Sequence, residues 1–263
     1  IEVDSHCVLP RPVFGKSLDR PFKFRKATDD QMRARVGRNW PIVREEVRRM
    51  PESWTPPFDP VDVRLELSKD GGAELLSKCE IDPTVVAVTG VTGGSSYAIE
   101  HWENWCDSGI RSYHMKRNNA ALSDGVSRMS PWIHYGMIST TRMVRDASSI
   151  GGKGAEKFLD EMLVFREHAQ HHVHSKDNPD DWANIPGWAI ASWNDRGPGV
   201  SELSAIELER GKSGDRLWDS AQTGLVRHGT MHNNVRMTWG KAFAGWREDC
   251  LLYTSPSPRD GFT

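Results

Sequence analysis

The sequence predicts a mainly α-helical fold, and three observations support that prediction. Beyond about residue 95, apolar residues recur at the three- and four-residue spacing of amphipathic helices. The period-two alternation of half-buried strands is nearly absent from the same region. Ser130 and Pro131 suit the start of a helix, and Gly229 suits the end of one. The predicted helices cover residues 96–106, 131–148, 155–172, 201–210, 215–228 and 233–246.

The residues before this region predict other elements. Ile1 to Asp4 are typical of a strand that ends in a loop, and a lone strand leaves its backbone groups unpaired. We therefore expect the first residues to belong to a sheet that lies mostly outside this chain. Residues 51–62 contain four prolines, which predicts an extended linker. The glycines of residues 90–94 lack the spacing of a nucleotide-binding loop, which favours a simple turn before a helix.

The last residues do not suggest native structure. Cys250 to Asp260 resemble the conceptual translation of a sequencing adapter, and Gly261 to Thr263 would then be index sequence. The alternative is a genuine tail rich in serine and proline. Residues 250–263 are therefore left out of the fold prediction, as a cloning scar would be.

Composition excludes several classes of protein. The chain has 263 residues with 34 basic and 36 acidic side chains, so bulk attraction to a polyanion cannot be its whole mechanism. Four cysteines at this length exclude a disulfide-stapled scaffold. A mean hydropathy of −0.59, with no apolar run near the roughly 20 residues that span a bilayer, excludes a membrane protein. With no basic-then-apolar leader, we expect a cytoplasmic protein, unusual mainly in its 11 tryptophans.

Two neighbouring segments suggest a binding site for an anion. Residues 127–136 read SRMSPWIHYG, in which Ser130 suits an N-cap and Pro131 the first helical position. Hydroxyls and free N–H groups at a helix start could bind a diphosphate, although an ordinary capped helix is the alternative. Tyr113, Arg117 and Asn118 lie some ten residues earlier, in a cluster that by itself is typical of a surface.

In a third segment, residues 158–174, polar and aromatic side chains are predicted to share one face of a helix. Glu161, Phe165, His168 and His172 recur at helical spacing, so a carboxylate and a ring could bind a base or sugar. The alternative is a half-buried amphipathic helix. The histidines at positions 168, 171, 172 and 174 lack an accompanying acid or cysteine of a known ligand set, so we predict no metal site.

A fourth segment is rich in tryptophan. Trp239 and Trp246 are seven residues apart, which places them on one helical face about 10 Å apart along the axis. Closely spaced indoles can pass an electron stepwise, and Trp218 lies on the preceding helix. The alternative is a tryptophan-rich core seam.

Together, these segments resemble the flavin domain of the cryptochrome/photolyase superfamily, and class II cyclobutane-dimer photolyases most of all. Tyr113, Arg117-Asn118 and residues 127–136 are similar to the family pattern Y…RN…LS.LSP..HFG. Residues 158–167 are similar to FLEE…RE, and residues 217–239 to LW..Q…MH…RM.W. Residues 2–6 resemble the strand that ends the family's N-terminal α/β domain. The resemblance covers nearly all of residues 1–249.

The resemblance implies a domain order. Residues 1–10 would be the last strand of a truncated, Rossmann-like α/β N-terminal domain, and residues 11–94 an interdomain linker with helices. Residues 95–249 would form the all-helical FAD-binding domain, cut short at its C-terminal end. An antenna chromophore could occupy the missing N-terminal domain.

The resemblance also implies residue roles. The FAD contacts would be Tyr113, Val126, Ser127, Arg128, Met129, Ser130 and Arg236; the contacts to damaged DNA would be Arg117, Asn118, Phe165 and Asn233; and the catalytic residues would be Glu161, Trp239, Trp218 and Trp246. Trp239 would be the relay residue nearest the flavin. Asn233 departs from the class II pattern, which usually has glycine there, and resembles class I instead.

The activity implied is light-dependent repair of UV-damaged DNA by a monomer. One electron passes from photoexcited reduced flavin to a pyrimidine dimer, the cyclobutane ring splits, and the electron returns. The alternative is a cryptochrome-like flavin photoreceptor that signals without repair.

Overall fold

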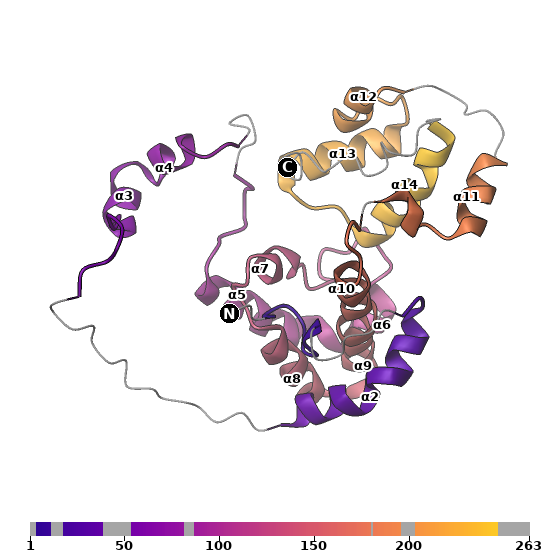
Figure 1. Ribbon diagram of the computed structural model, residues 1–263, viewed down its shortest axis with the longest axis horizontal. Helices are drawn as coiled ribbons and strands as arrows, with labels where there is room; N and C mark the ends of the chain where they lie inside the picture. Colours follow the sequence, from indigo (N-terminus) through magenta and orange to yellow (C-terminus); the bar gives the residue numbers. More distant parts are fainter. Residues whose placement is uncertain are drawn as a thin grey trace.

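The structure, a computed structural model, describes residues 4–11, 18–38, 54–81, 87–179, 181–195 and 203–246. Within these ranges the chain is helical and contains no strand, which confirms the predicted fold class (Figure 1). Of the strand expected within residues 1–10, residues 1–3 lie outside the described residues and residues 4–10 are irregular rather than extended in a sheet. The tail at residues 250–263 also lies outside the described residues. No helix in the described part is both long and apolar enough to cross a bilayer.

A central body of short helices contains the main core. Its elements are α5 (Ser95–Ser108), η1 (Ile110–Ser112), α6 (Tyr113–Lys116), α7 (Ser130–His134), α8 (Thr140–Ile150) and α9 (Gly152–Asp160). Trp102 is completely buried at the centre, with its ring centroid 5.7 Å from that of Trp105 and 5.2 Å from that of Phe158. The indole Nε1 of Trp102 donates to a carboxylate oxygen of Asp146 at 2.9 Å, so its one polar atom is satisfied.

Gly154 allows α9 to cross closely over η1. A Cβ atom at this position would lie 2.1 Å from the carbonyl oxygen of Ile110, so any larger residue would push the two elements apart. The close crossing brings Phe158 of α9 against Tyr113 of α6, with ring centroids 5.9 Å apart.

The helix predicted over residues 155–172 is present, but it contains a wider turn. α9 continues without a break into η2 (Glu161–Arg166), a π-helical turn, and then into α10 (Glu167–His174). A π-turn takes an extra residue and shifts every later side chain around the axis. The spacing of Glu161, Phe165 and His168 is therefore not that of a regular α-helix.

The helix predicted over residues 131–148 is in fact two helices. α7 ends at His134, Gly136 takes a left-handed φ of 66°, and α8 starts after Ser139, whose hydroxyl accepts from the Arg142 N–H. The expected cap is also displaced by one residue, because Ser130 is the first residue of α7 and Met129 is its N-cap. The helix predicted over residues 201–210 shortens to α12 (Ala205–Glu209), which starts with a capping box of Ser204 and Glu207.

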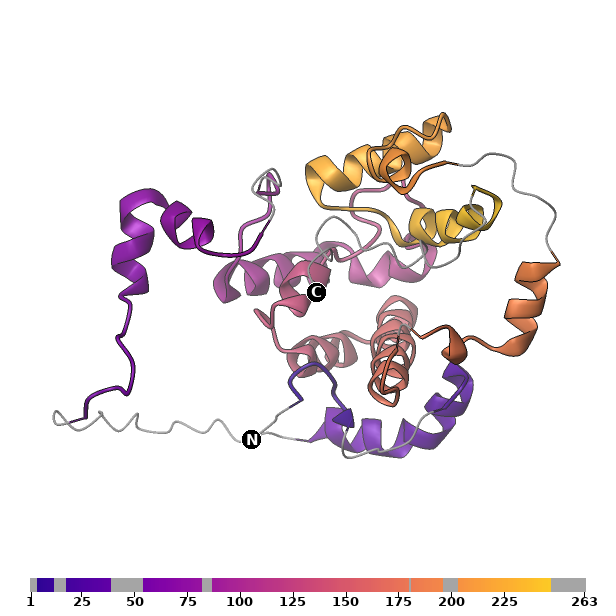
Figure 2. The ribbon, with the colours of Figure 1, turned by 45° about the horizontal axis from the view of Figure 1, so that its top comes forward.

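Two further groups of helices lie on opposite sides of the body (Figures 1 and 2). On one side, α2 (Pro21–Gly37) packs against α8 and η2 and buries Phe24, Thr28 and Met32. On the other side lie α12, α13 (Arg216–His228) and α14 (Asn233–Trp246). The bounds of α13 and α14 closely match the helices predicted over residues 215–228 and 233–246. Between α10 and α12 the chain forms η3 (Trp182–Asn184) and α11 (Gly187–Asn194).

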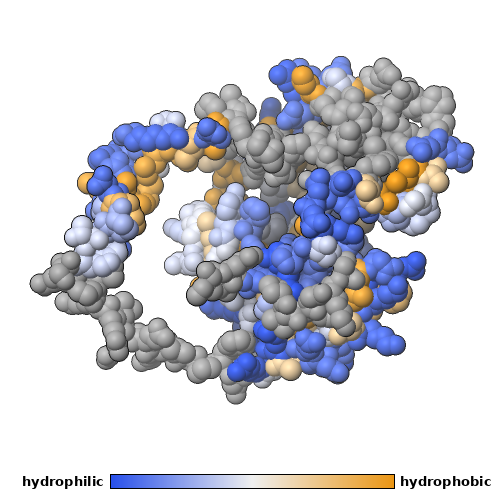
Figure 3. All heavy atoms as spheres, in the orientation of Figure 1, coloured by the Kyte–Doolittle hydropathy of each residue, from blue (hydrophilic) through white to orange (hydrophobic). Residues whose placement is uncertain are grey.

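The segment with α3 (Val63–Asp70) and α4 (Ala73–Ser77) extends away from the body (Figure 1). Residues 54–62 are free of helix, as the proline content predicts. The apolar side chains of this segment are exposed, and Figure 3 shows them along its surface; they include Phe58, Val61, Val63, Leu65, Leu67 and Leu76.

Candidate functional site

A carboxylate between two cations forms the centre of the candidate site. Glu161, the first residue of η2, lies 2.8 Å from Nη2 of Arg117, which follows α6, and 2.8 Å from Nζ of Lys157 in α9. All three side chains are between 19% and 30% exposed, so the pairs are shielded from water but reachable. The structure thus joins Glu161 and Arg117, which are 44 positions apart in the sequence.

Phe165 lies on the same side of the helix as this charged group. The residue is 45% exposed, and Nζ of Lys157 lies 5.3 Å from the centroid of its ring. The other two residues of the expected face diverge from it. His168 bonds the carbonyl of Leu18 at 2.7 Å and stacks against His172, so these two rings serve packing.

Tyr113 forms the buried wall beneath Arg117. The guanidinium carbon of Arg117 lies 5.7 Å from the Tyr113 ring centroid, and the ring meets Trp105 edge-on at 5.7 Å. Burial raises the pKa of the Tyr113 hydroxyl, against the opposing effect of the hydrogen bond from Arg117. The Tyr113 hydroxyl therefore stays neutral near pH 7, and the buried ring is held in place by its neighbours.

The loop from Val126 to Ser130 joins this wall to α7. Met129 is buried and anchors the loop in the core, whereas Arg128 and Ser130 are exposed. Arg128 has a φ of 54°, which is rare and strained for a residue with a side chain. The carbonyl of Ser127 bonds a ring nitrogen of His101 at 2.9 Å. The loop is thus anchored to the core through Met129 and Ser127, while the side chains of Arg128 and Ser130 face solvent.

The start of α14 reaches the same region. Nδ2 of Asn234 donates to the carbonyl of Asn118 at 3.0 Å, which brings α14 beside the end of α6. Arg236 and Asn233 are both exposed, and Nη2 of Arg236 donates to the side-chain oxygen of Asn233 at 2.8 Å. The expected DNA and cofactor residues of α14 therefore contact each other as well as solvent.

Two of the three tryptophans predicted to form a relay lie side by side. Trp218 and Trp239 are buried, with ring centroids 5.6 Å apart at an interplanar angle of 78°. Nε1 of Trp218 donates to the carbonyl of Leu208, and the three residues form a small second core. The side chain of Trp246 lies outside the described part, so the third member stays a prediction.

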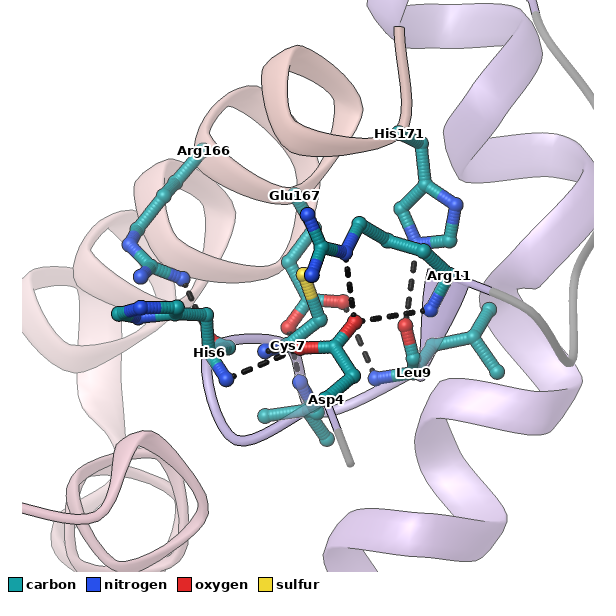
Figure 4. Close-up of polar contacts among 9 residues, drawn as sticks. Asp4, His6, Cys7, Leu9, Arg11, Arg166, Glu167 and His171 are labelled. Atoms are coloured by element: carbon teal, nitrogen blue, oxygen red, sulfur yellow. Dashed lines mark hydrogen bonds and ion pairs between the residues drawn. The ribbon is translucent and has the colours of Figure 1, made fainter. Parts of the chain in front are cut away.

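A buried network that the sequence analysis missed ties the N-terminal segment to α10 (Figure 4). The carboxylate of Glu167 is 1% exposed and accepts the N–H groups of Val8 at 2.5 Å and Leu9 at 3.1 Å. Burial raises the pKa of Glu167 to about 7, although the two N–H donors oppose the shift. His171, one turn later, bonds the carbonyl of Leu9 at 3.0 Å.

Asp4 organises the other half of this network. Its carboxylate accepts the N–H groups of His6, Cys7 and Arg11 and the Nε–H of Arg11. Burial opposes ionisation, but the backbone donors prevail and lower the pKa of Asp4 to about 2. The Asp4 contacts are local, whereas those of Glu167 and His171 join α10 to backbone about 160 positions earlier in the sequence, which no periodicity signals.

One group of metal-type ligands lies in this network. Within the described ranges, Cys7, Glu167 and His171 place ligand atoms within 4.8 Å of one another, and all three are buried. Both oxygens of Glu167 and one nitrogen of His171 already bond the backbone of residues 8 and 9. Burial, together with the Glu167 charge, raises the pKa of the Cys7 thiol to about 12. The arrangement therefore serves to fasten the N-terminal segment.

A groove of about 1060 Å³ lies beside the site, between α2, α8 and α9. Lys157 and Asp160 are among the residues that line it, and the lining carries charges of both signs. Asp160 forms ion pairs with Lys157 and with Arg25 of α2, so α2 is connected to the charged centre at Glu161.

Known proteins match this chain over much of its length. A deoxyribodipyrimidine photo-lyase of Methanothermobacter thermautotrophicus is 32% identical over 158 residues, which is 59% of this chain and 35% of that protein. One of Oryza sativa subsp. japonica is 26% identical over 254 residues, 93% of this chain and 48% of that protein. In sequence the chain is similar to these members of the cryptochrome/photolyase superfamily. It spans about a third to a half of the length of these curated superfamily relatives.

The superfamily fold is also found by structure. The crystal structure of a bacterial class III photolyase from Agrobacterium tumefaciens superposes with a TM-score of 0.50 at 21% identity, over 64% of this chain and 36% of that one. No protein-family model matches the chain. The helical fold of the chain is thus similar to that of part of this photolyase.

Proposed function

We propose that the protein containing this chain binds FAD and uses light to split cyclobutane pyrimidine dimers in UV-damaged DNA. The observation that carries the proposal is the pairing of Arg117 with Glu161 beside the half-exposed ring of Phe165. These residues come from two distant segments and are the ones that the family resemblance assigns to the lesion. The sequence relatives described above are deoxyribodipyrimidine photo-lyases, which supports the same activity.

The residues present fit a cofactor with phosphates and polar edges. Two buried polar atoms in this region, Nε of Arg117 and Nε2 of His232, have no hydrogen-bond partner within the described part of the chain. Arg128 and Ser130 turn their polar groups outwards from an anchored loop. The residues that would hold FAD are Tyr113, Val126, Ser127, Arg128, Met129, Ser130 and Arg236. The chemistry that FAD supplies when bound is light-driven transfer of one electron.

The chain's own residues would bind and orient the lesion. Glu161 accepts hydrogen bonds only, so it selects a ligand that presents an N–H, such as a pyrimidine ring. Phe165 offers an apolar face on which a base taken out of the stack could pack. Arg117 would hold the carboxylate in place, while Asn118 and Asn233 lie at the exposed rim where DNA would pass.

Trp239 and Trp218 would pass an electron between the flavin region and Trp246. Their centroid separation of 5.6 Å and edge-to-face contact suit a short step between indoles. We further propose a cytoplasmic monomer, with any antenna chromophore in a domain outside this chain.

The test uses the full-length protein that contains this chain, loaded with FAD and illuminated with blue light on dimer-containing oligonucleotides. We expect dimers to disappear, and Glu161→Ala to reduce repair while flavin content stays the same. Equal loss of flavin and repair would give Glu161 a structural role. Unchanged dimers with bound flavin would instead favour a photoreceptor without repair.

A further inference from the structure

We propose that Lys157 is a positioning residue that fixes the orientation of Glu161 and Phe165 before the substrate binds. This inference rests on the proposed function, because it concerns the same site. Nothing in the sequence pattern singles out Lys157, which looks like one of several charged residues on an amphipathic helix.

The two cations bind the same oxygen of Glu161. Nη2 of Arg117 and Nζ of Lys157 both lie 2.8 Å from Oε1, whereas no hydrogen bond or ion pair from the described residues reaches Oε2. Two charge-assisted contacts on one oxygen hold the carboxylate in one rotation. Oε2 is therefore the acceptor that is presented to a ligand.

Lys157 contacts three side chains at once. Its Nζ donates to Oδ2 of Asp160 at 2.8 Å, forms the ion pair with Oε1 of Glu161, and lies 5.3 Å from the centroid of the Phe165 ring. Asp160 is in turn paired with Arg25 of α2. These contacts restrict the rotamers of Lys157, and through Lys157 they also restrict the side chains of Glu161 and Phe165.

The π-turn brings the ring to the lysine. In a regular α-helix, residues eight apart are displaced by about 80° around the axis, because each residue turns about 100°. The wider η2 turn rotates less per residue and offsets much of that displacement between Glu161 and Phe165. Lys157, Glu161 and Phe165 consequently line up on one side, as their contacts show.

The consequence is preorganisation. Glu161 and Phe165 are partly exposed and would otherwise lose rotamer freedom when a ligand binds. Ordering them in advance favours a ligand that needs both an acceptor and an apolar face, and has no effect on general attraction to DNA phosphates. Lys157 should therefore affect discrimination between damaged and intact DNA rather than overall DNA affinity.

The experiment measures binding of the full-length FAD-loaded protein, in the dark, to two oligonucleotides of one sequence, with and without a single pyrimidine dimer. The variants are Lys157→Met, Lys157→Arg, Glu161→Gln and the double variant Lys157→Met/Glu161→Gln. Lys153→Met is the matched control, since Lys153 is exposed one turn earlier on α9. Lys157→Gln replaces the methionine variant if that protein does not fold, and flavin absorbance and melting temperature are recorded for each.

We expect Lys157→Met to lower the preference for damaged DNA about tenfold, with unchanged flavin content, as for the loss of a charge-assisted contact. Lys157→Arg should restore most of the preference, and Lys153→Met should leave it unchanged. The double variant should lose no more than Glu161→Gln alone, because both act through one carboxylate.

Two results would overturn the proposal. Lys157→Met could keep the preference that Glu161→Gln loses, or the losses of the two single variants could add in the double variant. If the unsubstituted protein binds both oligonucleotides equally, the proposed function itself has failed, and Lys157 has no substrate to position.

Discussion

Two glutamates on one continuous helix show how differently the same side chain can be used. Glu161 lies at the start of the π-turn, partly exposed, with two cations on one oxygen and none of the described residues on the other. Glu167 lies six residues later, is completely buried, and binds two backbone N–H groups. Sequence spacing cannot separate the two, whereas burial and partners do.

The difference indicates which residue holds the fold and which meets a ligand. The buried carboxylate replaces the solvation of the Val8 and Leu9 N–H groups and so fastens the N-terminal segment to α10. The exposed carboxylate contributes little to stability, because partly exposed ion pairs are weak. Its order is useful only if something binds to it.

The largest expected effect is on stability at Glu167. Glu167→Ala removes the acceptor for two buried N–H groups and leaves a cavity, so we expect a loss of about 3 kcal/mol in the free energy of unfolding. Urea unfolding of the full-length protein measures it, with Glu161→Ala as the matched control. A loss at Glu167 no greater than at Glu161 would break the comparison.

A second effect concerns pH. The pKa of Glu167 is about 7 in the folded protein and 4.5 for the free side chain, so between these values the folded state holds a proton that the unfolded state lacks. Its contribution is therefore fully favourable below about pH 4.5 and is lost as the pH rises through 7, by at most about 3 kcal/mol.

The measurement for this pH effect is the unfolding free energy at pH 5.5 and pH 7.5 in the protein and in Glu167→Gln, which cannot titrate. We expect the unsubstituted protein to gain stability relative to the variant at the lower pH. Asp4, with a pKa near 2, acts in the opposite direction only below about pH 4 and does not interfere. An identical pH response in the two proteins would show that Glu167 does not titrate in this range.

The smallest expected effect is the stability change at Glu161. Glu161→Ala should cost about 1 kcal/mol or less, because Arg117 and Lys157 remain able to reach water or other partners. Thermal melting at low and high salt measures it, and high salt should shrink the difference further. A loss of several kcal/mol would give Glu161 a structural role like that of Glu167.

Periodicity and end signals predict most of the helices, including α13 and α14 almost to the residue. They fail where the backbone departs from regular α-helix over a few residues. At Gly136 one predicted helix divides into two, and at η2 the helix continues as a π-turn. The resemblance names Glu161 and Arg117, but only the folded chain shows that they meet. Glu167 falls within the family pattern, but that pattern gives neither its burial nor its partners in the N-terminal segment. Lys157 matches no motif, and its role comes from the contacts that the π-turn allows along one helix.

The most direct test substitutes each glutamate by glutamine in the full-length protein and measures two quantities for both variants. These are the free energy of unfolding and the preference of the folded protein for dimer-containing DNA. We predict that Glu161→Gln loses the preference with little change in stability, whereas Glu167→Gln changes stability and its pH dependence with the preference intact. The reverse pattern, or equal loss of both quantities in both variants, would contradict the division between a binding carboxylate and a structural one.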